Sequence, residues 1–355
     1  MGAIKEVFMK KKKVLVAMSG GIDSSVCAHL VREMGYEAAG ITMQLWGDDK
    51  ANSEDAKRIC DRLSMEHDTV ALNEKFQQCV VDRFISDYID GLTPNPCVEC
   101  NRCLKFGTLF ELAMERGYDY LATGHYAKVE QSESGAWQLK KADDAQKDQS
   151  YFLWSIKKET LPHLILPLGS YTKPQIRAIA EEHHFENARR SDSQDICFIP
   201  NGDYASFIQS HTNQDFPKGS FVSKDGRVLG EHQGLIHYTV GQRKGLGIAL
   251  GHPAFVASKN AAENTVTLTA DEELYQRELS ATRLNFLCDE PSGDLRVSAK
   301  IRYRHTPAEA TLQIIGEDRV KLIFDEPQRA IAPGQSVVFY DGDIVLGGGI
   351  IEPNF

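Results

Sequence analysis

Three cysteines stand within seven residues, in the run Thr93-Pro94-Asn95-Pro96-Cys97-Val98-Glu99-Cys100-Asn101-Arg102-Cys103. The prolines restrict the backbone ahead of Cys100, and the residues from Phe106 onward have a helical pattern. We therefore predict a pinned loop that presents Cys100 just before a helix, where a thiol tends to ionise and become nucleophilic. A fourth thiol, Cys197, follows much later in the run SQDICFI. The pattern favours sulfur or metal chemistry.

The remaining cysteines give no such signal. Cys27, Cys60 and Cys79 fall in helical patterns, and Cys288 falls in an expected strand or loop. We interpret these four as small packed apolar side chains. Structural disulfides are not expected in a cytosolic chain of this size.

A glycine-rich turn is the second chemical feature. The run Ser19-Gly20-Gly21-Ile22-Asp23-Ser24-Ser25 follows the apolar stretch Lys13–Met18 and precedes a helical pattern. Two glycines allow positive φ and a close approach of the backbone to a phosphate. The serine hydroxyls and the helix N-terminus add donors and a favourable dipole. No Gly-Lys-Ser/Thr follows, so this is not a Walker A loop.

Strands and helices of similar length must position these groups in the N-terminal half. Buried strands are predicted at 13–18, 38–43, 66–71 and 120–123, and helices at 24–34, 53–63, 74–88 and 106–116. Such alternation predicts a doubly wound parallel sheet with ligands at the carboxyl ends of its strands. Ser19 and Gly124 both fall at such ends.

The pattern changes after about residue 205, where short β-rich runs are separated by glycine and Asp-Gly turns. We predict an α/β domain at 1–205, a central β-rich domain at 206–277 and a C-terminal β-barrel domain at 278–355. The fold class is therefore α/β plus all-β, with two small barrel-like domains after the parallel sheet.

Charge is unevenly distributed along the chain. The formal net charge is −10, which argues against a uniformly basic nucleic-acid binder. Between Lys218 and Lys259, however, six Lys or Arg stand against two acids, and this excess favours a polyanionic partner. No apolar run is long enough for a membrane span, and the N-terminus does not have the pattern of a secretory signal. We expect a cytoplasmic protein without a membrane partner.

The chain resembles a known family. SGGIDS is similar to the signature of the PP-loop ATP pyrophosphatases, which cleave ATP between the α- and β-phosphates. Over nearly its whole length the chain resembles the bacterial tRNA-specific 2-thiouridylases (the MnmA/TrmU family). The motifs that carry the resemblance are AMSGGIDSS, PNPCVECN…KF, ATGHYA, KDQSYFL, DSQDICFI, GQRKGLGI, RYRH and PGQSVVFY.

The resemblance implies a role for particular residues. ATP would be bound by Ala17, Met18, Ser19, Gly20, Gly21, Ile22, Asp23, Ser24, Met43 and Gly124. The catalytic thiols would be Cys100, as nucleophile, and Cys197, as carrier of a persulfide. Contacts with tRNA would come from Asn95, Pro96, Cys97, His125, Lys147, Asp148, Gln149, Arg302, Tyr303 and Gln335.

The implied activity is ATP-dependent formation of 2-thiouridine at the wobble position of the tRNA anticodon loop. ATP with Mg²⁺ adenylates the C2 oxygen of the uridine, and sulfur from a Cys197 persulfide then replaces that oxygen. AMP and pyrophosphate are released, and a Cys100–Cys197 disulfide is left for reduction. A persulfide donor or relay protein is the expected partner of a monomeric enzyme.

One departure from the family pattern leaves an alternative open. Many members have Asp where this chain has Cys97, so Glu99 or water would replace that carboxylate if the step needs one. The change also creates Cys97-x-x-Cys100-x-x-Cys103. These thiols, with Cys197, are alternative ligands for a [4Fe-4S] cluster, or less favourably for zinc.

A PP-loop amidoligase is the rival activity, but it predicts neither paired thiols nor a locally basic β-rich half. The adjacent His183 and His184 are interpreted as a solvated pair and not as a metal site, and no metal ligand is firmly predicted.

Overall fold

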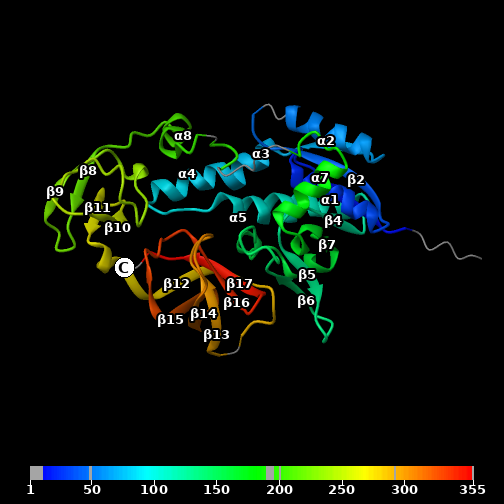
Figure 1. Ribbon diagram of the computed structural model, residues 1–355. Coiled ribbons are helices and arrows are strands. Elements are labelled where there is room, and N and C mark those ends of the chain that lie inside the picture. Colours follow the sequence, from blue (N-terminus) through cyan, green and yellow to red (C-terminus); the bar gives the residue numbers. More distant parts are fainter. Residues whose placement is uncertain (1–10, 48–49, 189–195, 200, 292, 354–355) are drawn as a thin grey trace, which may run out of the picture. The chain divides into compact units, whose positions relative to one another are not determined.

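The computed structural model describes residues 11–47, 50–188, 196–199, 201–291 and 293–353 (Figure 1). These residues form two compact units, each assembled from several stretches of chain. The first unit holds the described residues up to Asn73, those of Leu104–Gln149 and those within Glu159–Asp192. The second unit holds Glu74–Cys103, Ser150–Lys158 and the described residues that follow to the C-terminal end. The predicted domain boundaries after residues 205 and 277 stay a prediction.

The first unit is built on a parallel sheet of five strands in the order β3-β2-β1-β4-β7. Its strands are β1 Lys13–Ala17, β2 Glu37–Gln44, β3 His67–Ala71, β4 Tyr120–Ala122 and β7 Leu164–Ile165. The central strand β1 has three fully buried residues in a row because helices cover both of its faces. This is the doubly wound sheet that the alternating pattern predicts.

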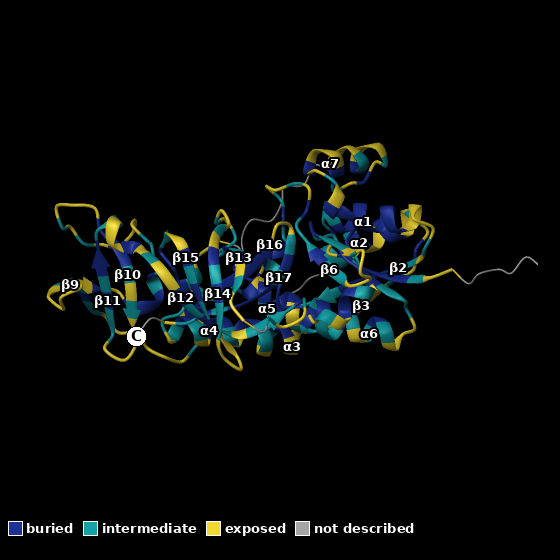
Figure 2. Ribbon diagram, turned by 90° about the horizontal axis from the view of Figure 1, so that it is seen from below, coloured by how far each residue is buried: buried dark blue, intermediate teal, exposed yellow. Residues whose placement is uncertain are grey.

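Helices lie on both faces of this sheet. They are α1 Ile22–Glu33, α2 Lys50–Arg62, α6 Leu109–Glu115 and α7 Lys173–Glu182. Figure 2 shows α1 and α2 on one side of the sheet and α6 on the other. Buried side chains of β1, α1, α2 and α7 share one apolar core, which fixes the start of α1 at the carboxyl end of β1. Gly35, with φ of +88°, ends α1 as predicted.

Smaller elements complete the first unit. The strands β5 Lys128–Gln131 and β6 Trp137–Lys140 form an antiparallel hairpin that the sequence analysis did not predict. The short strand β7 was also missed, because two residues show no periodicity. In both units, the 3₁₀ helices among the described residues are η3 Ser150–Phe152, η4 Lys158–His163, η5 Pro167–Ser170, η6 Leu235–His237 and η7 Asp271–Leu274.

The second unit holds the predicted β-rich half. Four strands pair in the order β10-β11-β8-β9 around their own apolar core. They are β8 Gly219–Val222, β9 Val228–His232, β10 Phe255–Asn260 and β11 Thr265–Thr269. Six more strands close into a barrel in the order β12-β15-β14-β13-β16-β17, because β12 also pairs with β17. They are β12 Tyr275–Phe286, β13 Leu295–Lys300, β14 Ala308–Gly316, β15 Arg319–Arg329, β16 Ser336–Asp341 and β17 Ile344–Ile351. The predicted fold class, α/β plus all-β, is confirmed.

Helical stretches precede and accompany these strands. They are α3 Asn73–Phe76, the π-helical turn η1 Gln77–Val81, α4 Asp82–Ile89, α5 Pro96–Cys100, the π-helical stretch η2 Asn101–Thr108 and α8 Tyr204–Ser210. Helix η2 continues directly into α6, so the helix predicted from Phe106 begins ten residues earlier, at Pro96. In the part of the chain that the structure describes, no helix is both long and apolar enough to cross a membrane.

Candidate functional site

The glycine turn between β1 and α1 is closed by its own serines. The Ser19 backbone N–H donates to Ser24 Oγ over 3.2 Å, and the Ser24 hydroxyl donates to the Gly21 carbonyl over 3.0 Å. Gly20 has φ of +73°, as the turn requires, whereas Gly21 has an ordinary extended backbone with φ of −86°. Of the two glycines that allow positive φ, only Gly20 uses it. The turn places the first N–H groups of α1 at the carboxyl end of β1, an arrangement that favours anions.

Gly124 explains how the loop after β4 reaches this turn. A Cβ atom at Gly124 would lie 2.8 Å from the carbonyl carbon of Asp23 and 3.0 Å from the Ser24 nitrogen. Only glycine allows this approach, so Gly124 is brought beside the turn as the sequence predicts. Met43 is near the end of β2, past the register of Ala17 with Ile41, and so lies at the same edge of the sheet.

Asp23 is held by two side chains that the sequence analysis missed. Its carboxylate accepts a hydrogen bond from Tyr126 Oη over 2.7 Å and lies 2.8 and 2.9 Å from Lys173 Nζ. The Lys173 side chain is only 8% exposed. A signal was present, because a lysine in the first turn of a helix opposes the helix dipole and needs another reason to be there. The capping box of Thr172 and Gln175 marks that helix start in the sequence.

Asn187 is a further residue missed at the turn. Its side-chain amide donates to the Gly20 carbonyl and to Ser25 Oγ, both over 2.9 Å. The described part of the turn is thus held from three directions: by Gly124 after β4, by Lys173 at the start of α7, and by Asn187.

The helix α5 carries the first two thiols of the cysteine run. Asn95 is its N-cap, with Oδ1 accepting from the Cys97 N–H over 3.2 Å, and Pro96 takes the first helical position. Cys100 is therefore the last residue of α5, not a residue ahead of the helix as predicted. Cys97 lies in the first turn and is exposed, whereas Cys100 is 9% exposed.

The segment that leads into α5 is anchored from distant parts of the second unit. The Gln335 amide donates to the Thr93 carbonyl over 2.8 Å, and the Thr93 N–H donates to the Pro333 carbonyl over 2.8 Å. Lys259 donates to the Leu92 carbonyl over 3.3 Å, and burial lowers its pKa to about 7. Gln335, predicted to contact tRNA, thus uses its side chain here to hold the turn before Asn95.

Cys103 contacts the side chains of Arg102 and Cys79. It lies in the π-helical stretch η2, a kind of distortion that is frequent at functional sites. Arg102 Nη2 lies 3.3 Å from its Sγ. Burial, followed by the contact with Cys79, raises the pKa of Cys103 to about 11. Cys103 would have to give up its contacts with Cys79 and Arg102 to bind a cluster together with Cys97 and Cys100. These contacts therefore do not favour a role as a cluster ligand.

Cys197 is exposed and belongs to the same unit as Cys100. The adjacent Phe198 packs edge to face against Phe76 and Phe84, with ring centroids 5.6 and 5.5 Å apart. Asp192–Asp195 of the motif DSQDICFI lie outside the described residues. No disulfide joins Cys100 to Cys197 among the residues described, so the disulfide expected between them is not formed in this structure.

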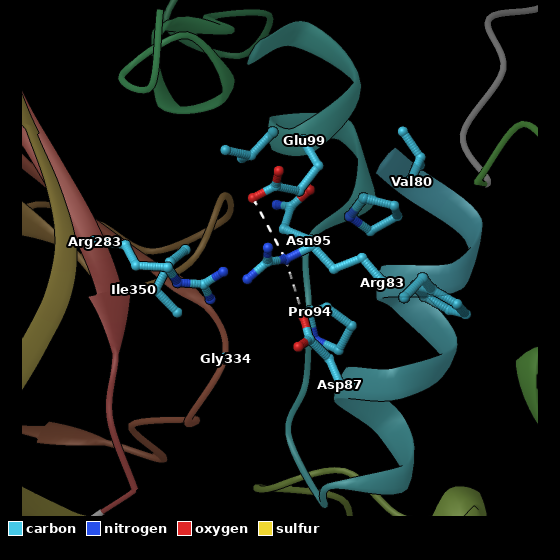
Figure 3. A pocket seen from close by; sticks show the side chains of 12 residues that line it. Val80, Arg83, Asp87, Pro94, Asn95, Glu99, Arg283, Gly334 and Ile350 are labelled. Atoms are coloured by element: carbon cyan, nitrogen blue, oxygen red, sulfur yellow. Dashed lines mark ion pairs between the residues drawn. The ribbon is translucent and has the colours of Figure 1, made fainter. Parts of the chain in front are cut away.

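A small pocket lies beside the first turn of α5 (Figure 3). Its charged side chains are Arg83, Asp87, Glu99 and Arg283, and its volume of about 10 Å³ is that of one water molecule. The remaining lining residues are Val80, Phe84, Pro94, Asn95, Pro96, Val98, Gly334 and Ile350. Phe84 lines this pocket and packs on Phe198, so the segments that carry Cys100 and Cys197 both pack on α4.

The carboxylates of this pocket have distinct environments. Arg83 Nε lies 3.9 Å from Asp87 and 3.8 Å from Glu99, and Arg102 lies 2.7 Å from Glu99. Burial raises the pKa of Asp87 to about 6, against the opposing effect of Arg83. Glu99, the expected replacement for the missing family carboxylate, is thus already paired with two guanidinium groups.

Several residues predicted to contact tRNA have internal contacts. Asp148 is buried and accepts from the Ala142 N–H, and Gln149 Oε1 accepts from the Tyr126 N–H. His125 Nδ1 lies 2.7 Å from Thr123 Oγ1, and burial followed by the charge of Lys105 holds the pKa of His125 well below its usual value.

Two residues after β13 and one before η3 complete the set predicted to contact tRNA. Arg302 donates to the Arg329 carbonyl over 3.1 Å, and the Tyr303 ring packs on Phe152 with centroids 4.5 Å apart. Lys147 is half-buried. Their roles with tRNA stay predictions.

Three family models match successive parts of this chain. Residues 12–201 match the family described as the tRNA methyl transferase HUP domain. Residues 205–270 match the tRNA methyl transferase PRC-barrel domain, and residues 276–351 match the aminomethyltransferase beta-barrel domain.

Curated relatives match the whole chain. The tRNA-specific 2-thiouridylase MnmA of Clostridioides difficile (strain 630) is 45% identical, with 98% of this chain and 99% of the relative covered. That of Clostridium botulinum (strain Alaska E43 / Type E3) is 46% identical, with 97% and 99% covered. A crystal structure of a 4-thiouridine synthetase–RNA complex with bound ATP aligns at a TM-score of 0.36 and 18% identity, covering 56% of this chain and 50% of that one.

Proposed function

We propose that this chain, which belongs to the family of tRNA-specific 2-thiouridylases, converts the wobble uridine of tRNA to 2-thiouridine in an ATP-dependent reaction in the cytoplasm. The observation that carries the proposal is the helix α5. The N-cap at Asn95 and the hydrogen bond from Gln335 to Thr93 hold α5, and with it Cys100, in a defined position. A lead-in loop positioned by a rigid scaffold in this way is a frequent place for catalytic and binding residues.

ATP is the proposed first substrate, and the residues at the glycine turn fit it. The N–H groups at the start of α1 and the close approach allowed by Gly124 suit a phosphate chain. Lys173 adds a cation beside Asp23. Mg²⁺, when bound with ATP, would neutralise phosphate charge.

The proposed chemistry begins at the uridine. Its C2 oxygen attacks the α-phosphate of ATP, pyrophosphate leaves, and an O-adenylated base results. The terminal sulfur of a Cys197 persulfide then attacks C2, and AMP leaves with the oxygen. The Cys100 thiolate attacks the inner sulfur of Cys197, which breaks the sulfur–sulfur bond and leaves the outer sulfur on C2. The product is 2-thiouridine and a Cys100–Cys197 disulfide, which a dithiol reductant returns to two thiols.

We favour the persulfide over an Fe–S cluster because of Cys103. A cluster held by the cysteine run would need Cys103 to turn away from Cys79 and Arg102. The persulfide route leaves Cys103 where it is. It also explains why the segments of Cys100 and Cys197 pack on the same helix, α4.

The test measures 2-thiouridine in an unmodified tRNA transcript, with ATP and a persulfide donor, by mass spectrometry of the digested RNA. Cys100→Ser and Cys197→Ser are expected to lose thiolation by a factor of about a thousand or more, because each removes a group that reacts covalently. Both variants should still release pyrophosphate in a tRNA-dependent manner. Cys288→Ser, a half-buried cysteine elsewhere in the second unit, is the matched control and should be fully active.

Cys103→Ser separates the two sulfur routes. The persulfide route predicts that this variant keeps its activity, whereas a cluster bound by the run predicts loss of activity and of visible absorption in an anaerobic preparation. Full activity of both Cys100→Ser and Cys197→Ser would disprove the two-thiol reaction.

A further inference from the structure

Two helices of the first unit bring three potential metal ligands together away from the glycine turn. His29 and Glu33 are one turn apart on α1, and His183 is the C-terminal cap of α7. One ligand atom from each lies within 4.8 Å of the other two. In the part of the chain that the structure describes, this is the one group of three such side chains found at that spacing.

The local geometry suits a tetrahedral ion. His29 Nε2 lies 3.3 Å from Glu33 Oε1, and two ligands about 2.1 Å from a zinc ion at the tetrahedral angle are about 3.4 Å apart. The imidazole rings of His29 and His183 have centroids 3.8 Å apart.

The surroundings leave the group accessible. His29 is buried, whereas Glu33 is exposed and His183 is half-exposed, so an ion can enter from solvent. The Phe185 ring stands beside both imidazoles, with centroids 6.3 and 6.2 Å away, and forms an apolar wall.

We propose that His29, Glu33 and His183 form a binding site for a divalent transition-metal ion of the Zn²⁺ class, with water as the fourth ligand. Two imidazoles and a carboxylate are a known zinc ligand set. The site differs from the cysteine run in its ligands and in the unit that holds it. His183 and His184, interpreted from the sequence as one solvated pair, then have separate roles.

The position of the site suggests what the ion does. The first turns of α1 and α7 are joined by the ion pair of Asp23 with Lys173. The ion would join the same two helices near their C-terminal ends. Bound metal would thus clamp α7 to the helix that begins at the glycine turn, and it would add stability in proportion to its binding.

The experiment uses the full chain, stripped of metal with a chelator and kept reduced, titrated with Co²⁺ as an optical probe. A site of nitrogen and oxygen ligands gives visible d–d bands without the intense near-ultraviolet band that thiolate ligands give. Binding at the cysteines is therefore distinguished within the same titration. Zn²⁺ added afterwards should displace the cobalt and erase the bands.

The variants test the three ligands separately. His183→Ala and Glu33→Gln, both at accessible positions, should lose the thiolate-free bands. The matched control is His184→Asn, because His184 is exposed and has φ of +52°, which asparagine tolerates. It should bind as the parent does. Zn²⁺ should raise the melting temperature of the parent and of His184→Asn, but not that of His183→Ala.

Two outcomes would overturn the proposal. One is the absence of thiolate-free bands in the parent chain. The other is equal binding by the parent and His183→Ala when both give the same melting temperature without metal, since that result would place the ion elsewhere.

Discussion

The glycine turn and the segment before Cys100 are both held in a fixed conformation, but by different kinds of contact. The hydroxyls of Ser24 and Ser25 both donate to the Gly21 carbonyl, so the closure of the turn follows from local sequence. The lead-in to α5 is held by Gln335, Pro333 and Lys259, which are far away in the chain. A motif closed by local hydrogen bonds can be recognised from its sequence. The conformation of a segment held by distant residues is visible only in the folded structure. The predictions below test this difference, from the largest expected effect to the smallest.

The largest effect is expected where the glycine turn does depend on a distant residue. Lys173→Met removes the buried partner of Asp23 and should lower the free energy of unfolding by about 3 kcal/mol, because a partly buried carboxylate is left without its cation. Urea denaturation measures this. Lys57→Met, which breaks an exposed pair with Asp61, is the control and should cost about 0.5 kcal/mol or less. Equal losses in the two variants would contradict a special role for Lys173.

A second effect should come from the close approach at Gly124. Gly124→Ala places a methyl group 2.8 Å from the Asp23 carbonyl carbon, and overpacking of this kind costs about 2 kcal/mol. Because the start of α1 must shift, ATP affinity should also fall, as measured by equilibrium dialysis. The control is Gly293→Ala, where the new methyl group meets nothing within 4 Å and no positive φ is strained. Unchanged ATP affinity in Gly124→Ala would separate Gly124 from the nucleotide site.

The pocket beside α5 makes a prediction about pH. The pKa of Asp87 is raised to about 6 in the folded chain from an ordinary value of 3.8. The folded state therefore holds the proton more tightly, and stability falls as the pH rises from about 4 to 6. Asp87→Asn should remove this penalty and stabilise the chain by about 1–2 kcal/mol at pH 7.5, with less gain at pH 4. Urea denaturation at the two pH values checks it, and a gain independent of pH would show that ionisation is not the cause.

The smallest effect should come from the long-range anchor of the thiol segment. Gln335→Ala removes the hydrogen bond to the Thr93 carbonyl and should cost about 1 kcal/mol. If Gln335 acts by holding the turn, the KM for tRNA should rise while ATP affinity stays the same. Gln313→Ala, a half-buried residue bonded to Asp294 in the barrel, is the control and should change neither. A change in ATP affinity with Gln335→Ala would contradict the local role.

Much of the fold was predictable because it follows from local patterns. Strand β1 shows an unbroken apolar run, and Gly35 marks the end of α1. The hairpin β5–β6 and the strand β7 were missed because they are too short to show a period. The start of α5 was also missed, since Pro94 and Pro96 suggested a loop where Asn95 and Pro96 in fact begin a helix.

The sequence by itself determined the parallel sheet, the glycine turn, the two β-rich parts and the family, because short-range periodicity and contiguous motifs carry them. Only the tertiary structure decided which side chains meet: Lys173 with Asp23, Gln335 with Thr93, and Cys103 with Cys79. The reason is physical. A buried charge or carbonyl is stabilised by whichever partner folding brings to it. Because the partners can lie far apart along the chain, the sequence around one does not identify the other.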